Sequence, residues 1–155
     1  MKYTVRREDR VMSEAEAIAL LNVAEYGYLS TIGSDGVPYG LPISFVYDDN
    51  TLILHCALEG RKIDNIRHED RVSFCVVGKT LVQPAQFTTR YESIVVFGRA
   101  EMIEDAERKA ALLMKFCEKY TPLHLEAAEK AISGSLYRTA VIVINIESVT
   151  GKAKR

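Results

Sequence analysis

Two adjacent cations, Arg61 and Lys62, follow a glycine at the point where an apolar, strand-like run gives way to a helix-like segment. The first turn of a helix carries unpaired N–H groups and partial positive charge, so local electrostatics favour acidic residues there. Cations at this position, together with the free N–H groups, can form a cradle for a phosphate monoester. The alternative is an exposed basic pair with no ligand. Because local rules tend to be broken at functional sites, we favour the phosphate site.

His55 lies just before the basic pair. In a strand it shares one face with Ile53 and Ala57, whereas Leu54 and Cys56 point to the other face. A single histidine in an apolar strand is more often structural than a ligand. No second His or Cys stands at metal-ligand spacing, so the sequence predicts no metal site. A role for His55 beside a bound cofactor stays open.

Several catalytic motifs are absent from the sequence. Neither of the short segments "GSD" and "GSL" has the context of a nucleophile elbow. The chain also has no GxGxxG and no GxxxxGK[ST] motif. Ordinary dinucleotide-binding and nucleoside-triphosphate-binding folds are therefore disfavoured.

Composition limits the possible partners. The chain has 155 residues, 48% of them hydrophobic, so one domain spanning residues 1–155 is expected. Its 20 basic and 21 acidic residues nearly cancel, so no overall field attracts nucleic acid or an anionic membrane. Any phosphate recognition must be local.

The cysteines and the N-terminal region indicate the compartment. Cys56, Cys75 and Cys117 lie in apolar runs and are expected to be buried thiols in a reducing compartment. There is no apolar run of signal-peptide type and none of about 18 residues that could span a membrane. A cytoplasmic protein is the expectation.

The first half of the chain predicts one helix and three strands. Ser13 and Glu16 form a capping box for a helix over residues 13–24. Three strands should follow over residues 26–58, joined by hairpin turns at 34–36 and 48–50. Pro38 and Pro42 cannot donate ladder hydrogen bonds, so the second strand should be irregular or lie at an edge.

The rest of the chain predicts three helices and three strands. A helix of two or three turns is expected over residues 59–70, then strands over 71–77 and 91–103 with a long binding or interface loop at 78–90 between them. Asp105 should cap a helix that ends before Pro122, and Pro122 should open a further helix that Gly134 closes. A last strand is expected over 139–151.

This order predicts a mainly β protein. It lacks the regular alternation of strands and helices seen in doubly wound sheets. Six mostly antiparallel strands closing into a small barrel with peripheral helices fit it better. Leu, Ile, Val and Phe side chains would fill the barrel, so a ligand would bind on its outside or at a subunit interface.

Three segments together resemble a known family. They are "GYLSTIGSDGVPYGLPISFVYDDNTLILHCALEGRKIDNIRHEDRVSF" (27–74), "YESIVVFGRAEMIED" (91–105) and the terminal "ESVTGK" (147–152). They are similar to the flavin-binding split barrels related to pyridoxamine 5′-phosphate oxidase, and within that group to the nitroimidazole-resistance (Nim-like) branch. The HxAxEGRK segment combined with YxSIVVxGR carries most of the specificity.

The resemblance implies a homodimer with flavin mononucleotide (FMN) in two grooves at the subunit interface. Arg61 and Lys62 would bind the flavin phosphate. The remaining cofactor-binding positions that the resemblance implies are Leu41, Pro42, Ile43 and Ser44 along the flavin ring, His55 and Cys56 at a strand end beside the cofactor, and Ser93 as a polar contact. His55 is also the implied substrate-side group.

The chain differs from pyridoxamine phosphate oxidases in its last residues. Pyridoxamine phosphate oxidases end in an Arg-Leu-x-Pro type segment, whereas this chain ends "TGKAKR". This difference argues against pyridoxamine phosphate as the substrate.

The functional expectation is a flavin-dependent oxidoreductase that reduces a small acceptor such as a nitroaromatic or a quinone. FAD or a deazaflavin could replace FMN. Two alternatives of other classes remain: a haem-binding split barrel with His55 as the iron ligand, and a flavin-binding protein without catalytic activity.

Overall fold

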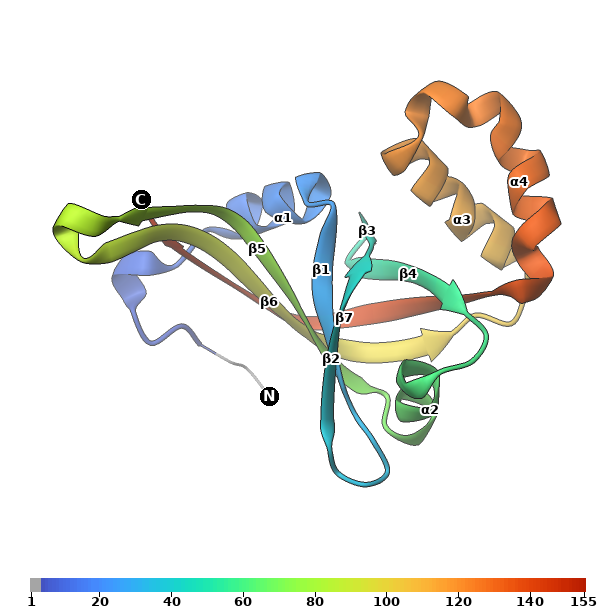
Figure 1. Cartoon of the computed structure of the whole chain (residues 1–155), viewed down its shortest axis with the longest axis horizontal. Coiled ribbons are helices and arrows are strands. Elements are labelled where there is room, and N and C mark those ends of the chain that lie inside the picture. The colour runs from blue at the N-terminus through green and yellow to red at the C-terminus, as the bar shows by residue number, and fades with distance from the viewer. Residues whose placement is uncertain (1–3) are drawn as a thin grey trace.

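The computed structural model describes residues 4–155, whose strands form one antiparallel sheet with helices around it (Figure 1). The order of the strands in the sheet is β2-β1-β5-β6-β7-β4-β3. The strands are β1 (Tyr26–Ile32), β2 (Pro38–Ser44), β3 (Val46–Asp48), β4 (Thr51–Ala57), β5 (Arg71–Gln83), β6 (Thr88–Met102) and β7 (Thr139–Lys154). The α-helices are α1 (Glu14–Val23), α2 (Arg61–His68), α3 (Ala106–Tyr120) and α4 (Ala128–Ser135).

The sheet curls into a split barrel. β2 and β3 follow each other along the chain with only Phe45 between them, yet they occupy opposite ends of the strand order. The chain itself therefore crosses the gap between the two ends of the sheet. The predicted mainly β split barrel is confirmed, with two differences. The described residues form seven strands rather than six, because the second expected strand breaks at Phe45, and hydrogen bonds do not close the barrel.

β2 lies at an edge of the sheet, as its prolines predicted. Its ladder partner is β1, with Pro42 opposite Tyr28 and Pro38 opposite Ile32. Proline cannot donate a ladder hydrogen bond and is tolerated at such an edge. The outer edge of β2 consequently presents backbone groups that no further strand within residues 4–155 covers.

The prediction of a loop over residues 78–90 is wrong. β5 continues to Gln83 and β6 begins at Thr88, so most of this segment forms a long hairpin, which extends to the left in Figure 1. Its tip is a 3-10 turn, Pro84–Gln86, followed by Phe87 in a left-handed conformation with φ 51°. The β-branched residues Val77, Thr80 and Val82 favour the extended conformation, and pairing between the two strands maintains it.

The helix ends were partly predicted. Ser13 and Glu16 form the capping box of α1, and Asp105 caps α3 by accepting a hydrogen bond from the N–H of Arg108. Pro122 opens a 3-10 segment, Pro122–Ala127, before α4 starts. The prediction that Gly134 closes the last helix is wrong, because α4 includes this residue and runs on to Ser135.

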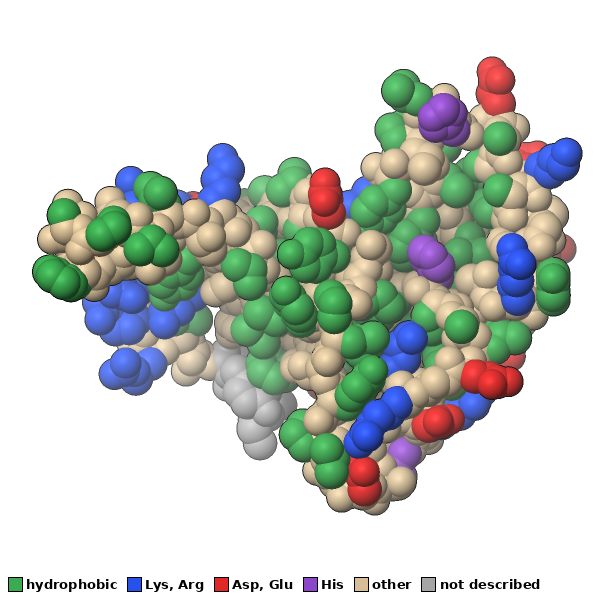
Figure 2. Space-filling view, viewed as in Figure 1, with side chains coloured by type: hydrophobic (Ala, Val, Ile, Leu, Met, Phe, Trp, Pro, Cys, Tyr) green, Lys and Arg blue, Asp and Glu red, His purple; other side chains and the backbone are tan. Residues whose placement is uncertain are grey.

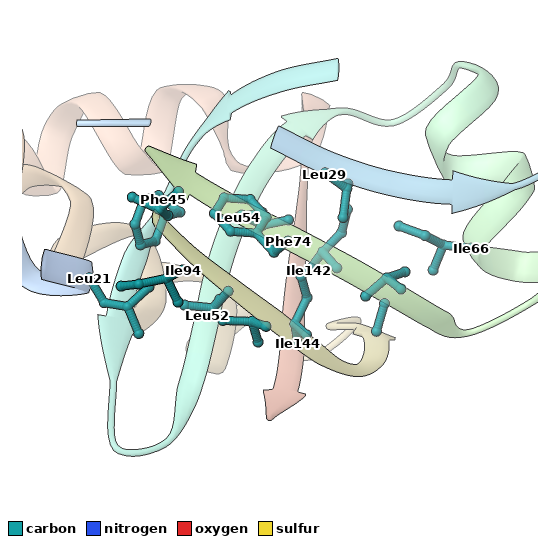
Figure 3. Packing of buried hydrophobic residues seen from close by; sticks show 14 of the residues in the cluster. Leu21, Leu29, Phe45, Leu52, Leu54, Ile66, Phe74, Ile94, Ile142 and Ile144 are labelled. Atoms are coloured by element: carbon teal, nitrogen blue, oxygen red, sulfur yellow. The ribbon is translucent and has the colours of Figure 1, made fainter. Parts of the chain in front are cut away.

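Two apolar clusters fill the molecule. The larger lies inside the barrel and includes Phe45, which packs edge-on against Phe74 with ring centroids 4.9 Å apart (Figure 3). The smaller joins α3 and α4 to the outer face of β4 and β7. The cysteines were expected to be buried, but Cys56, Cys75 and Cys117 are half-buried free thiols. No helix within residues 4–155 is long and apolar enough to cross a membrane.

Candidate functional site

The predicted phosphate cradle lies at the start of α2. Gly60 precedes the helix with φ 129° and ψ 165°, a conformation open to glycine, and no side chain in the described part of the chain caps the helix. The first backbone bonds of the helix run from the N–H groups of Ile63 and Asp64 to the carbonyl of Gly60. The N–H groups of Arg61 and Lys62 precede these bonds and are the ones that an anion could accept from.

Arg61 is held from the β1–β2 turn. Its guanidinium donates a 3.2 Å hydrogen bond to Oδ2 of Asp35 and lies 5.4 Å from the ring centroid of Tyr39 on β2. Both partners were missed from the sequence. The only local indication was the Gly-Ser-Asp-Gly turn, which predicted a reversal of the chain but not what the carboxylate contacts.

Lys62 is half-buried beside Cys56, the penultimate residue of β4. Burial raises the pKa of the Cys56 thiol, and the nearby Lys62 ammonium partly offsets that shift. The thiol is therefore protonated at neutral pH. The structure places Cys56 at the base of the cradle, next to a cation, where it can donate a weak hydrogen bond but carries no charge.

A buried polar pair fixes the position of α2. Nδ2 of Asn65 donates a 2.9 Å hydrogen bond to Oγ1 of Thr31, whose hydroxyl donates to the carbonyl oxygen of Tyr39. Asn65 and Thr31 are 4% and 2% exposed. Since buried polar groups need partners, this pair sets how the start of α2 sits against β1 and β2.

The residues expected along the flavin ring lie on the edge strand β2. The side chains of Leu41 and Ile43 pack against the barrel core, whereas Pro42 and Ser44 are exposed. Leu41 and Ile43 are partly buried, so their backbone and the exposed parts of their side chains can contact a ligand. Arg61 contacts Tyr39 on this same strand, so the cradle and the free edge of β2 are neighbours.

His55 lies on the other face of β4 from Cys56. Its ring packs edge-on against Phe116 of α3, with centroids 4.4 Å apart, and the residue is otherwise exposed to solvent. Burial lowers the pKa of His55, so the imidazole is neutral at pH 7. The structure separates His55 from the cradle within one protomer and places it beside the α3–α4 pair.

Ser93 also stands apart from the cradle. It lies on β6 between Val77 of β5 and Lys152 of β7, on the face of the sheet opposite to the buried Ile94. Large apolar side chains are exposed on β1 and β5 of the same sheet, and Figure 2 shows hydrophobic groups gathered over the middle of this view. The exposed large apolar side chains on these two strands are Tyr26, Tyr28, Ile32, Val77, Leu81 and Val82.

Taken together, these groups fit a planar ligand that carries a phosphate monoester. Free N–H groups and two cations suit the phosphate, and an uncovered strand edge next to them suits the polar edge of a ring system. A side chain at position 60 would meet no atom within 4 Å, so the approach to the N–H groups is open. Within residues 4–155 no three His, Cys, Asp or Glu side chains gather as a metal-binding group.

Comparison with known proteins gives a consistent match along the chain. The family model described as pyridoxamine 5′-phosphate oxidase matches residues 13–153. No match was found among curated proteins.

Solved structures extend this result. A protein of Bacteroides thetaiotaomicron assigned to 5-nitroimidazole antibiotic resistance shares 25% identity and a TM-score of 0.79, covering 92% of this chain and 86% of that one. A FAD-binding protein of Mesorhizobium loti shares 25% identity and a TM-score of 0.66, covering 94% and 98%. A FAD- and haem-binding protein of Mycobacterium smegmatis shares the fold, with 16% identity, a TM-score of 0.73 and coverage of 96% and 74%.

Proposed function

Because the chain belongs to the pyridoxamine 5′-phosphate oxidase family and is similar to its nitroimidazole-resistance branch, we propose that it binds FMN and reduces small acceptors such as nitroaromatics. The observation that carries this proposal is the uncapped start of α2, where Arg61 contacts β2 through Tyr39 and Lys62 lies beside Cys56 of β4. Bound FMN would supply the two-electron redox chemistry.

Each part of the site has a separate task in this proposal. Arg61, Lys62 and the first N–H groups of α2 bind the phosphate. The backbone of β2 near Ile43 and Ser44 lies along the ring, where an N–H group stabilises negative charge that develops during reduction. Neutral His55 lies on the acceptor side, where its imidazole can donate one hydrogen bond and accept another.

We also propose that the site is completed by a second copy of the chain. Ser93 is remote from α2 within the protomer, so it could contact the same cofactor only from a partner subunit. The exposed tyrosines and aliphatic residues of the sheet support such an interface, because contiguous apolar surface is characteristic of interaction sites. The expected cytoplasmic location stays a prediction.

An absorbance spectrum of the freshly purified protein, from about 300 to 700 nm, with mass analysis of the molecule released by heat, tests the cofactor. FMN is the expected result. FAD or a deazaflavin would keep the oxidoreductase and change the cofactor. A Soret band lost in His55→Ala would instead support the haem alternative, and bound flavin without turnover with any donor and acceptor would support the non-catalytic one.

A matched pair of variants tests the phosphate assignment. Arg61→Ala should weaken FMN binding about 10- to 150-fold, the loss expected for one charge-assisted hydrogen bond. Arg67→Ala removes an exposed arginine from the last turn of the same helix and should leave the affinity unchanged. Equal affinities of Arg61→Ala and the wild type in a fluorescence titration would refute the cradle.

A further inference from the structure

The crossing point of the split barrel, Phe45, has no place in either flanking strand. Phe45 is fully buried, so its backbone N–H and C=O need hydrogen-bond partners. Because the residue lies outside both strands, a β-ladder does not supply them. Both find them on side chains from the last turn of α3. The N–H donates to Oη of Tyr120 at 3.1 Å, and the carbonyl accepts from Nζ of Lys119 at 2.9 Å.

The same two side chains also hold the start of β1. Oη of Tyr120 donates to the carbonyl oxygen of Glu25 at 2.5 Å, and Nζ of Lys119 donates to that of Ala24 at 2.7 Å. Oη also lies 2.8 Å from the carbonyl oxygen of Phe45, but a hydroxyl has only one proton, and Lys119 already donates to that oxygen.

Lys119 is an unusual choice for this position. Its ammonium lies 4.3 Å from the ring centroid of Phe45 and 5.2 Å from that of Tyr120, and no carboxylate in the described part of the chain pairs with it. Carbonyl dipoles and aromatic faces are therefore its compensation for partial burial, which lowers the pKa of the amine. A cation held this way restrains the direction of both carbonyls.

We propose that Tyr120 and Lys119 are positioning residues for the cofactor groove. By holding Phe45 they fix the end of β2, whose last residue, Ser44, also interacts with the Tyr120 hydroxyl. The α3 helix thereby sets the path of the strand edge along which the flavin ring is proposed to lie. This inference rests on the proposed function and assigns it two residues that contact neither phosphate nor ring.

The first measurement needs no cofactor. Hydrogen exchange of the unliganded protein should show the Phe45 amide exchanging at least about tenfold faster in Tyr120→Phe, a variant that removes only the hydroxyl that accepts from it. Tyr137→Phe changes an exposed tyrosine and should leave this amide unchanged. Unaltered protection of the Phe45 amide in Tyr120→Phe would show that the Tyr120 hydroxyl does not hold Phe45, and would overturn the proposal.

The second measurement uses the flavin-loaded protein. Loosening the β2 edge should weaken binding of reduced FMN more than that of oxidised FMN in both Tyr120→Phe and Lys119→Met. A tenfold change in this ratio lowers the midpoint potential by about 30 mV for a two-electron couple. Leu113→Ala destabilises the same helix through its buried apolar face and should leave the potential unchanged.

These outcomes separate the inference from the proposed function. If the wild type binds FMN and the potential of Tyr120→Phe is unchanged, the positioning role is refuted and the flavin site stands. The same conclusion follows if Leu113→Ala shifts the potential equally, since general loosening would then explain the effect. If the wild type does not bind FMN, the proposed function is refuted, and the positioning role with it.

Discussion

Asp35 and Arg61 pair at 3.2 Å between the β1–β2 turn and the first residue of α2. The pair joins the cradle at the start of α2 to the β1–β2 turn. Both side chains are about half exposed, so the ion pair itself contributes little to folding. Its consequence is functional, because a carboxylate here neutralises one of the two cations that a phosphate would meet.

Asp35→Asn should tighten FMN binding by about two- to fivefold, since it removes a negative charge worth up to about 1 kcal/mol beside the phosphate. The amide oxygen of Asn can still accept the 3.0 Å hydrogen bond from the N–H of Val37, which keeps the turn intact. Titration of the apoprotein at low salt measures the effect, and high salt should reduce it. Weaker binding would show that Asp35 orients Arg61 rather than competing for it.

Gly60→Ala should destabilise the fold and disturb the cradle. A residue with a side chain at φ 129° and ψ 165° costs about 1 to 3 kcal/mol, which corresponds to roughly 2 to 12 °C in melting temperature for a chain of this size. The open space around the position means that strain, not a clash, is responsible.

Gly134→Ala provides the matched control. This glycine lies inside α4 with no atom near an added side chain, so alanine should stabilise the helix by about 0.5 to 1 kcal/mol. Thermal unfolding of both variants should therefore show shifts of opposite sign. A neutral Gly60→Ala would mean that the start of α2 adopts another conformation in solution.

Local features of the fold could be predicted from the sequence. The capping box of Ser13 and Glu16 lies within one turn of helix, and the Arg61–Lys62 pair directly follows Gly60 at a change from apolar strand to polar helix. These features depend on residues that are neighbours in the chain, so spacing alone identifies them.

The parts that were missed depend on contacts between distant segments. Phe45 lies in an apolar run that looks like one continuous strand, and the break needs the Tyr120 hydroxyl from 75 residues away. The 78–90 hairpin contains Gly78 and Pro84, which favour a loop, but its two strands pair with each other and Nζ of Lys154, at the end of β7, donates a hydrogen bond to Oγ1 of Thr88. The types of the residues in a segment do not show which distant segments will contact it.

Thr31→Val should lower the free energy of unfolding by about 1 to 3 kcal/mol, because it leaves the buried amide of Asn65 without its acceptor. Urea unfolding measures the loss, and Thr80→Val, on the exposed part of β5, should change stability by less than about 0.5 kcal/mol. In the double variant with Asn65→Leu, part of the loss should be recovered, since both polar partners are then gone. Strictly additive losses would show that the two residues do not depend on each other.

His55 should make stability depend on pH. Burial against Phe116 lowers its pKa in the folded protein from the ordinary value of 6.5, so the unfolded chain takes up this proton first as the pH falls. The contribution of His55 to stability is therefore greatest above pH 6.5 and decreases as the pH falls through that value. Melting temperatures of the wild type and His55→Gln, measured between pH 8 and pH 5, should differ most in favour of the wild type at high pH.

Phe116→Leu tests the cause of this pH dependence. Leucine keeps the side chain apolar but removes the ring that covers the imidazole edge-on, so His55 becomes better hydrated and its pKa returns toward 6.5. In the Phe116→Leu background, the effect of His55→Gln should then vary less with pH than it does in the wild type. An equally steep dependence in both backgrounds would mean that the histidine is desolvated by something other than α3, and its place beside that helix would no longer explain why it is neutral at pH 7.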